Sequence, residues 1–487
     1  MGDKQHGRAI IIATRPGFFA RMQLRSPVFE MLRQSGRPLV VLWPIPNDDR
    51  LRKELAAPNV FIEQLYTRHE TTYVRSLLKE TFQRMRVYVH PNEISSTAHT
   101  QRLNQLRSFI QSELWRRRFL WQLTIAGARL ANRSAMLRRG LLAAEHRVFR
   151  STAYQGVFER YKPGVVVTGT PGYFPWYEDA YLIREARQAG IPTICNVLSW
   201  DNPSTKGALG AIPDYSLVWT EEMKREFVLF HDVDPERIYV TGTPLFDVYV
   251  ASRDKDHRKE LIAQYGLDPA RKTILLGTMS PTSYRYNAAI AEILVRALVE
   301  GRFVEPVQII IRPHPINYNG DVNPDVHRMR ALMGHSPHVH ISTPQVLPGN
   351  TLDLSWTEVE QMVRLINGSD IVVNMFSTMQ LEAALADKPI INVAFDPGPV
   401  LPNEKSLAEI ETNYHIARLV RTGGIRLART PQDLLAQINQ YLVDPRLDRK
   451  GRKVIVQQES GPLDGRSAQR IAEFILAVAE GNIVPRL

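Results

Sequence analysis

The chain has a single cysteine, Cys195, and no long uninterrupted apolar segment. One cysteine excludes an intrachain disulfide and a cysteine-rich zinc site, and it favours a reducing, cytoplasmic environment. No apolar run approaches the ~18 residues that a membrane-spanning helix needs. The apolar stretch at residues 9–13 is too short for a signal peptide and predicts a first strand instead.

Acidic residues are scarce in one part of the chain. The net charge is +11, and residues 101–150 contain eleven arginines against two acids, together with Trp115, Phe119 and Trp121. This composition predicts basic amphipathic helices. They could contact an anionic membrane surface or an acidic lipid-linked acceptor, or they could form a solvated basic face packed by its tryptophans. Nucleic acid is not an expected partner, because no recognition module accompanies the charge.

Strand and helix patterns alternate along most of the chain. At 487 residues, with 44% apolar and 23% charged residues, two globular domains are expected. A charged helical joint at 251–272 divides the pattern. The sequence therefore predicts two doubly wound, Rossmann-like α/β domains facing a cleft, 1–250 and 251–487. The first carries a basic helical insertion at about 60–150. A last amphipathic helix is predicted at 464–480.

Two strand ends in the second half carry polar residues suited to phosphate. In Val307–Pro315, Arg312 and His314 each precede a proline, which favours an extended backbone and presents both side chains stiffly. In Asp370–Ala386, a strand runs into Ser377 and Thr378, and a helix is predicted from about Met379. Ser377 and Gln380 have capping-box spacing, which would leave the helix N–H groups to face an anion. Together the two ends predict a site for a nucleotide-activated donor.

Other residues are weaker candidates for the same chemistry. The loop 278–283 follows a predicted strand, and its hydroxyls on Ser280 and Thr282 could reach phosphate. A transferase also needs a general base that accepts the proton of the acceptor hydroxyl. Asp201 stands at a strand exit beside Trp200, which could stack on a sugar. Glu178 and Asp179 are alternatives, although acids in the first turn of a helix are stabilising in any case. Lys206 could steer an anionic group.

Several of these segments resemble the GT-B superfamily of nucleotide-sugar-dependent glycosyltransferases and UDP-N-acetylglucosamine 2-epimerases. Ala13–Gly17 (ATRPG) is similar to the epimerase start, which implies that Arg15 approaches the nucleotide. Val240–Pro244 resembles the segment that closes the first domain. The resemblance also implies that Ser377, with Gln380, contacts the diphosphate and that Glu382 contacts the ribose.

The segment Arg312–Pro315 (RPHP), with Ser377 and Thr378, looks like the CDP-glycerol glycerophosphotransferases of teichoic-acid synthesis, and CMP-sugar transferases share the His-Pro element. Ser199–Pro203 stands where the epimerases have an acidic segment. Because of this departure, the catalytic carboxylates of the epimerases have no clear counterpart in this chain. The difference favours a transferase over an epimerase.

The resemblance thus implies a cytoplasmic GT-B transferase, with the inner face of the membrane as a candidate contact. It would move a sugar or sugar-like phosphate unit from a UDP-, CDP- or CMP-activated donor to a cell-surface polysaccharide or a lipid-linked precursor. His314 would assist the leaving group. No metal or other cofactor is expected, because these groups can supply positive charge themselves. A nucleotide-sugar epimerase is the alternative, and a non-catalytic scaffold is a third hypothesis.

Overall fold

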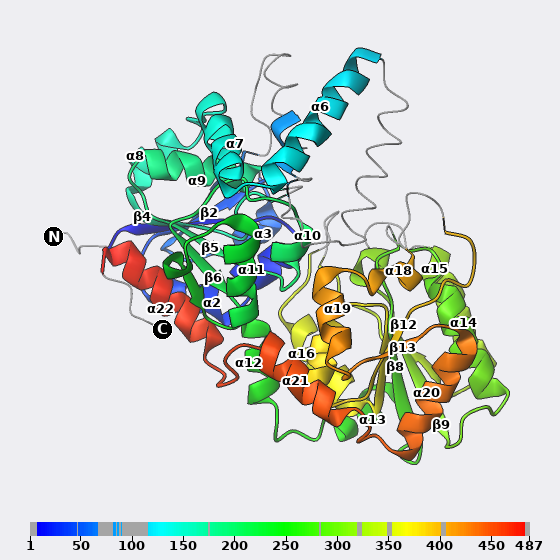
Figure 1. Ribbon diagram of the computed structural model, residues 1–487. Helices are drawn as coiled ribbons and strands as arrows, with labels where there is room; N and C mark the ends of the chain where they lie inside the picture. The colour runs from blue at the N-terminus through cyan, green and yellow to red at the C-terminus, as the bar shows by residue number, and fades with distance from the viewer. Residues whose placement is uncertain are drawn as a thin grey trace. The chain divides into compact units, whose positions relative to one another are not determined.

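The computed structural model describes residues 7–45, 47–66, 81–83, 85–86, 89, 115–173, 176–281, 284–318, 324–347, 353–400 and 406–482. These residues form two compact units. Unit 1 contains the described residues up to Pro244 and those from Arg466 onward, and unit 2 contains the described residues of Leu245–Gly465. The chain therefore returns to unit 1 at its end. The expected domains 1–250 and 251–487 do not include this return. Each unit is an α/β layer structure built on a parallel sheet (Figure 1).

The sheet of unit 1 has the strand order β3-β2-β1-β4-β5-β6-β7. Its central strands are near-continuous runs of Val, Ile and Leu, as expected for parallel strands covered by helices on both faces. The strands are β1 (Ala9–Ala13), β2 (Leu39–Trp43), β3 (Val60–Gln64), β4 (Pro163–Thr168), β5 (Thr193–Asn196), β6 (Tyr215–Val218) and β7 (Ile238–Val240).

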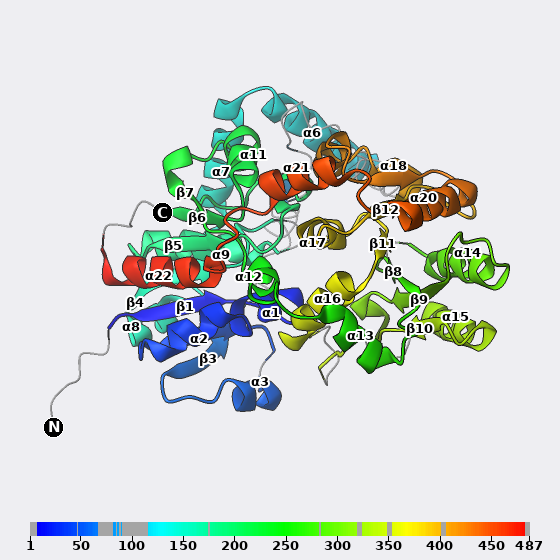
Figure 2. The ribbon, with the colours of Figure 1, turned by 90° about the horizontal axis from the view of Figure 1, so that it is seen from below.

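Two helical layers cover this sheet. Ile10, Ile12 and Val165 belong to a core cluster that includes side chains of α2 (Pro27–Gln34) and α22 (Ser467–Glu480). The alternate residues Ile11 and Val166 pack with α8 (Gln155–Tyr161) and α9 (Glu178–Gln188). Figures 1 and 2 both show α22 lying along α2, although more than 400 residues separate them in sequence.

The described residues of unit 1 also form other helices. They are α1 (Phe18–Leu24), α3 (Asp49–Glu54), α6 (Trp115–Asn132), α7 (Ala135–Val148), α10 (Asn202–Thr205) and α11 (Glu221–His231), with the 3-10 turn η1 (Pro235–Arg237). The predicted basic helices are thus present as α6 and α7, while residues 101–114 lie outside the described residues. No helix among the described residues is long and apolar enough to cross a membrane.

The sheet of unit 2 has the order β10-β9-β8-β11-β12-β13, and every pair is parallel. The chain order reverses between β8 and β11, which is the topological switch point where open α/β sheets bind ligands at the carboxyl ends of their strands. The strands are β8 (Lys272–Gly277), β9 (Val307–Arg312), β10 (Val339–Ile341), β11 (Ile371–Asn374), β12 (Ile390–Val393) and β13 (Arg426–Ala428).

Helices cover both faces of the second sheet (Figure 2). One layer contains α13 (His257–Tyr265), α16 (Thr357–Gly368), α17 (Met379–Leu385) and α21 (Arg449–Glu459), and the other contains α14 (Asn287–Val299), α15 (Pro324–Ala331) and α20 (Pro431–Val443). The remaining elements of the unit are α12 (Pro244–Ala251), α18 (Leu407–Ile410), α19 (Tyr414–Arg421), η2 (Pro315–Tyr318) and η3 (Leu332–His335).

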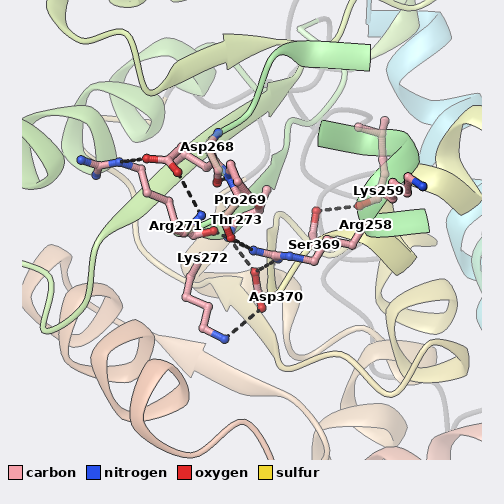
Figure 3. A network of polar contacts seen from close by, with 12 residues as sticks. Arg258, Lys259, Asp268, Pro269, Arg271, Lys272, Thr273, Ser369 and Asp370 are labelled. Atoms are coloured by element: carbon pink, nitrogen blue, oxygen red, sulfur yellow. Dashed lines mark hydrogen bonds and ion pairs between the residues drawn. The ribbon is translucent and has the colours of Figure 1, made fainter. Parts of the chain in front are cut away.

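A polar network fixes the amino-terminal ends of the two central strands (Figure 3). Asp370, directly before β11, accepts a hydrogen bond from the Thr273 N–H of β8 at 2.8 Å. The same carboxylate pairs with Arg258 at 2.8 Å and with Lys272 at 3.6 Å. This network locks the register of β8 against β11 at one edge, so that the opposite edge presents its strand ends in a fixed arrangement.

Candidate active site

The carboxyl ends of β9, β8 and β11 lie side by side in unit 2. Gly277 pairs in register with Arg312, and Leu276 pairs with Val373. His314 and Ser377 therefore leave the same edge of the same sheet, as the sequence predicts. The structure adds that β8 lies between their strands, so the two strand ends are about 10 Å apart, which is two strand spacings.

His314 is held by the loop that follows β8. Its N–H donates to the Thr278 hydroxyl at 2.9 Å, and the Ile316 N–H donates to its Nδ1 at 3.2 Å. Because Nδ1 accepts a hydrogen bond, the proton of the neutral ring lies on Nε2. The half-buried imidazole is thus arranged as a hydrogen-bond donor through Nε2.

The turn between β11 and α17 is tightly built. Phe376 has a positive φ of 57°, which is rare for a non-glycine residue and characteristic of strained functional turns. The side chain of Asn374 accepts from the Ser377 N–H at 3.1 Å, and the Ser377 hydroxyl accepts from the Met379 N–H at 3.3 Å. The N–H of Thr378 has no partner among the described residues, so it is one donor of this turn that a ligand could use.

The helix begins at Met379 as predicted, but the capping box does not form. Gln380 is fully buried, and its side-chain oxygen accepts a hydrogen bond from Asn392 of β12 at 2.8 Å. Its amide therefore ties the helix to the sheet and cannot also cap Ser377. Glu382 is also buried, and its charge adds to the effect of burial in raising the pKa of the Tyr249 hydroxyl.

Arg312 is committed to the protein interior. Its guanidinium pairs with the buried carboxylate of Glu358 and donates to the Ser342 hydroxyl at 3.0 Å. Glu358 in turn accepts from the Gln345 N–H at 2.7 Å. This network positions the end of β9 and pairs the charge of Arg312 with the carboxylate of Glu358.

The loop after β8 contributes through its backbone and through Thr278. Asn287, at the start of α14, accepts from the Met279 N–H at 2.9 Å and donates to the Met279 and Tyr284 carbonyls. Ser280 is half-buried in this clamped loop. Thr282 lies outside the described residues.

The carboxyl edge of unit 1 brings three of the predicted residues together. Arg15, after β1, donates to Asp179 at 2.7 Å and pairs with Glu178 at 2.9 Å, while Thr170 donates to Asp179 at 2.7 Å. Asp179 is fully buried and has its charge matched. Burial and the neighbouring Asp179 raise the pKa of Glu178, although Arg15 opposes the shift. Arg15 thus lies directly beyond the end of β1, paired with two carboxylates.

Asp201 stands at the amino end of α10, next to the same edge. Its carboxylate accepts hydrogen bonds from the hydroxyls of Ser199 and Thr205, the latter at 3.0 Å. The α10 turn is pinned by His231 of α11, whose Nε2 lies 2.8 Å from the Pro203 carbonyl. Asp201 is half-buried and accepts hydrogen bonds from two hydroxyls, and Asp179 forms an ion pair with Arg15.

The buried histidine gives stability a pH dependence. Burial lowers the pKa of His231 from 6.5 to about 4. Because the unfolded chain binds this proton at higher pH than the folded chain, stability is full above pH 6.5 and falls as the pH drops toward 4. The expected loss at pH 4 is about 3 kcal/mol for this residue. Urea denaturation of His231→Gln between pH 7 and 4 should give a shallower decline than the wild type, and equal slopes would contradict this assignment.

Sequence reasoning missed Asn374 and His231, and it treated Thr278 only as part of the loop 278–283. Asn374 ends an apolar strand and Thr278 follows another, so polarity at a strand exit was an available signal for both. His231 had no comparable signal, because its partner, the Pro203 carbonyl, lies 28 residues earlier in the chain.

Comparison with known proteins agrees with this architecture. Residues 208–477, more than half of the chain, match the family model of CDP-glycerol:poly(glycerophosphate) glycerophosphotransferase. No curated protein matches the chain in sequence.

Solved structures with the same fold include a UDP-bound protein, a UDP-GlcNAc 2-epimerase and a wall teichoic acid polymerase. S. aureus MnaA with UDP is 12% identical, covers 99% of both chains and has a TM-score of 0.51. A UDP-GlcNAc 2-epimerase from Neisseria meningitidis with UDP-GlcNAc is 12% identical over 96% of this chain and 99% of that one, with a TM-score of 0.50. The wall teichoic acid polymerase TagF is 11% identical over 98% and 89%, with a TM-score of 0.50.

Two Rossmann-type units with this strand order define the GT-B architecture, and the expected fold class is confirmed. The chain belongs to the CDP-glycerol:poly(glycerophosphate) glycerophosphotransferase family and is a nucleotide-dependent transferase of that type.

Proposed function

We propose that the protein transfers a phosphopolyol or sugar unit from a cytidine- or uridine-activated donor to a hydroxyl of a cell-surface polymer precursor. The observation that carries the proposal is the β9–β8–β11 edge. It joins an imidazole donor, a strained turn with an available N–H and a topological switch point in the segment that the family model matches. A CDP-linked donor fits the family best, and UDP- and CMP-linked donors are the alternatives.

The donor phosphate is proposed to occupy this edge of unit 2. The Nε2–H of His314 and the N–H of Thr378 would donate to its oxygens, and Ser377 would line the same turn. As the bond to the departing nucleotide breaks, negative charge grows on the leaving phosphate, and fixed donors stabilise such charge without reorganisation. With CDP-glycerol, the acceptor oxygen bonds to the outer phosphorus, the bond to CMP breaks, and CMP leaves with the electron pair.

The acceptor is proposed to bind to unit 1, with Asp201 taking the proton of its hydroxyl. Asp201 suits this role because its half-buried carboxylate is oriented by the hydroxyls of Ser199 and Thr205. Glu178 is the second candidate, because its raised pKa brings it closer to the working range of a general base. Asp179 and Arg15 are proposed to position the start of α9, which carries Glu178.

Asp201→Asn is expected to lower kcat by roughly 10²–10⁴-fold, the usual contribution of a general base. CMP release from CDP-glycerol in the presence of an acceptor measures it. Glu178→Gln is the matched control and should cost less than about tenfold. A large loss of kcat in Glu178→Gln with a small loss in Asp201→Asn would instead identify Glu178 as the base. Normal rates in both variants would show that neither residue is the base.

The epimerase alternative needs neither an acceptor nor a transferred unit. Incubation of the protein with UDP-N-acetylglucosamine alone should give no epimer on our proposal. Epimer formation without an acceptor would overturn transfer. A thermal-shift screen with CDP, CMP, UDP, GDP and dTDP would identify the donor base, since a ligand that binds only the folded state raises the melting temperature.

An anionic membrane surface is proposed as a partner of α6 and α7. Phe119, Leu123 and Leu130 are each more than half exposed, and their spacing of four and seven residues places them on one helical face. The exposed Arg129 and Arg133 lie on the same helix and directly after it. An exposed apolar stripe beside arginines is suited to the interface of an anionic bilayer.

Flotation with phosphatidylglycerol vesicles tests this contact. We expect the protein to float at low salt and to be released at high salt, because exposed charge is screened. Leu123→Glu combined with Leu130→Glu should abolish flotation. Met333→Glu, an exposed apolar position of unit 2, is the control and should have no effect. Absence of binding by the wild type at low salt would refute the membrane contact.

A further inference from the structure

A row of cations and aromatic rings lies at the carboxyl edge of unit 1. The Lys206 amine lies 5.5 Å from the centroid of the Trp176 ring, which packs edge-to-face on Phe19 with 4.7 Å between ring centroids. The Arg15 guanidinium covers the Phe19 ring at 4.6 Å. Trp176 and Lys206 are half-buried, and Trp176 comes from the loop that precedes α9. The row therefore extends from α10, which follows Asp201, to Arg15 and its two carboxylates.

The charges in this row are not evenly matched. Arg15 is shared by two carboxylates, Asp179 and Glu178, so it has no positive charge left over. Lys206 has no carboxylate within ion-pair distance among the residues that the structure describes, and its contact there is the face of the Trp176 ring. An aromatic face attracts a cation but does not cancel its charge. The edge thus presents one amine that an anion could reach.

The position of this amine relative to Asp201 suggests the class of ligand. Asp201 and Lys206 flank α10, a single helical turn of Asn202–Thr205 whose axial length is about 6 Å. His231 holds this turn through the Pro203 carbonyl. A short polyol could therefore span the distance between the two residues. With its terminal hydroxyl at Asp201, its other end would lie beside Lys206 and its carbon chain would lie against Trp176.

We propose that Trp176 and Lys206 form an acceptor subsite for the phosphate-bearing end of a polyol. Lys206 neutralises the acceptor phosphate, Trp176 packs against the polyol carbons, and the terminal hydroxyl is presented to Asp201. The subsite deepens the proposed function and rests on it for the identity of the reaction. Both residues precede residue 208, where the family match begins, so the proposed subsite lies outside the matched segment.

The test is calorimetric titration of sn-glycerol 3-phosphate, with and without saturating CDP to fill the donor site. The wild type should bind it, and Lys206→Met should bind it at least tenfold more weakly, because the amine is lost while the aliphatic stem is kept. Trp176→Leu should weaken binding as well. Lys224→Met, another half-buried lysine of unit 1, is the control and should bind normally.

Two further arms identify the chemistry. Inorganic phosphate and glycerol should each bind more weakly than glycerol 3-phosphate. Equal binding of inorganic phosphate would reduce the site to a simple anion site and overturn the polyol part of the proposal. Unchanged affinity in Lys206→Met, or no binding by the wild type, would overturn the whole proposal.

Turnover separates this proposal from the reaction itself. With CDP-glycerol as donor, the wild type should prefer glycerol 3-phosphate over glycerol as acceptor, and Lys206→Met should lose the preference while its KM for the donor stays constant. No CMP release from any donor, together with Lys206-dependent binding of glycerol 3-phosphate, would mean that the subsite is real and the proposed reaction is wrong.

Discussion

His314→Ala should lower turnover by roughly 10²–10³-fold, as loss of one donor to a developing oxyanion does in other enzymes. The loss is expected mainly in kcat, because the imidazole donates to an oxygen whose charge grows as the nucleotide leaves. The fold should survive, because the backbone N–H of residue 314 still donates to Thr278 in the variant, and the alanine removes only the bond from the Ile316 N–H to the ring. CMP release under donor saturation measures the effect.

Two controls sharpen this result. His314→Gln keeps an N–H donor and should recover part of the rate. His338→Ala removes another half-buried histidine of unit 2, placed before β10 at the opposite edge of the sheet, and should be neutral. Near-normal turnover in His314→Ala would reject the role of the imidazole.

Arg312→Met should destabilise unit 2 by about 3–5 kcal/mol. The substitution leaves the Glu358 carboxylate buried and without its cation, which costs far more than the intact pair contributes. Urea denaturation followed by far-ultraviolet circular dichroism measures the change. An unchanged unfolding midpoint would show that Glu358 is solvated or protonated without Arg312.

The double variant Arg312→Met with Glu358→Leu separates stability from ligand binding. Replacing both partners by apolar residues of similar volume is often neutral or stabilising. The pair should therefore recover most of the lost stability. If the recovered protein also transfers at a normal rate, Arg312 acts only by holding the end of β9. A folded but inactive double variant would instead assign the guanidinium to the donor phosphate.

The sequence was most informative where local chemistry decides structure. Buried parallel strands are apolar runs, so Val307–Arg312 and Ile371–Asn374 were recognisable, and the polar residues that follow them marked the ligand edge. The start of α17 at Met379 was also predicted, because a strand followed by Ser-Thr and an amphipathic stretch is a local signal.

Long-range pairing was not predictable in the same way. The predicted capping box does not form because the Gln380 side chain accepts a hydrogen bond from Asn392 on a neighbouring strand. Arg312 pairs with Glu358, which lies 46 residues further along the chain. The position of β8 between β9 and β11 follows from crossover connections rather than from strand composition. The packing of α22 on α2 requires the chain to return to unit 1, and no local sequence pattern predicts this return.

The position of a bound nucleotide diphosphate is the most direct test of the account. A crystal structure of the protein with CDP should place a phosphate oxygen within hydrogen-bond distance of the His314 Nε2 and of the Thr378 N–H, at the ends of β9 and β11. A diphosphate bound at the amino-terminal edge of the sheet, near Asp370, or bound with no contact to either group, would contradict the account.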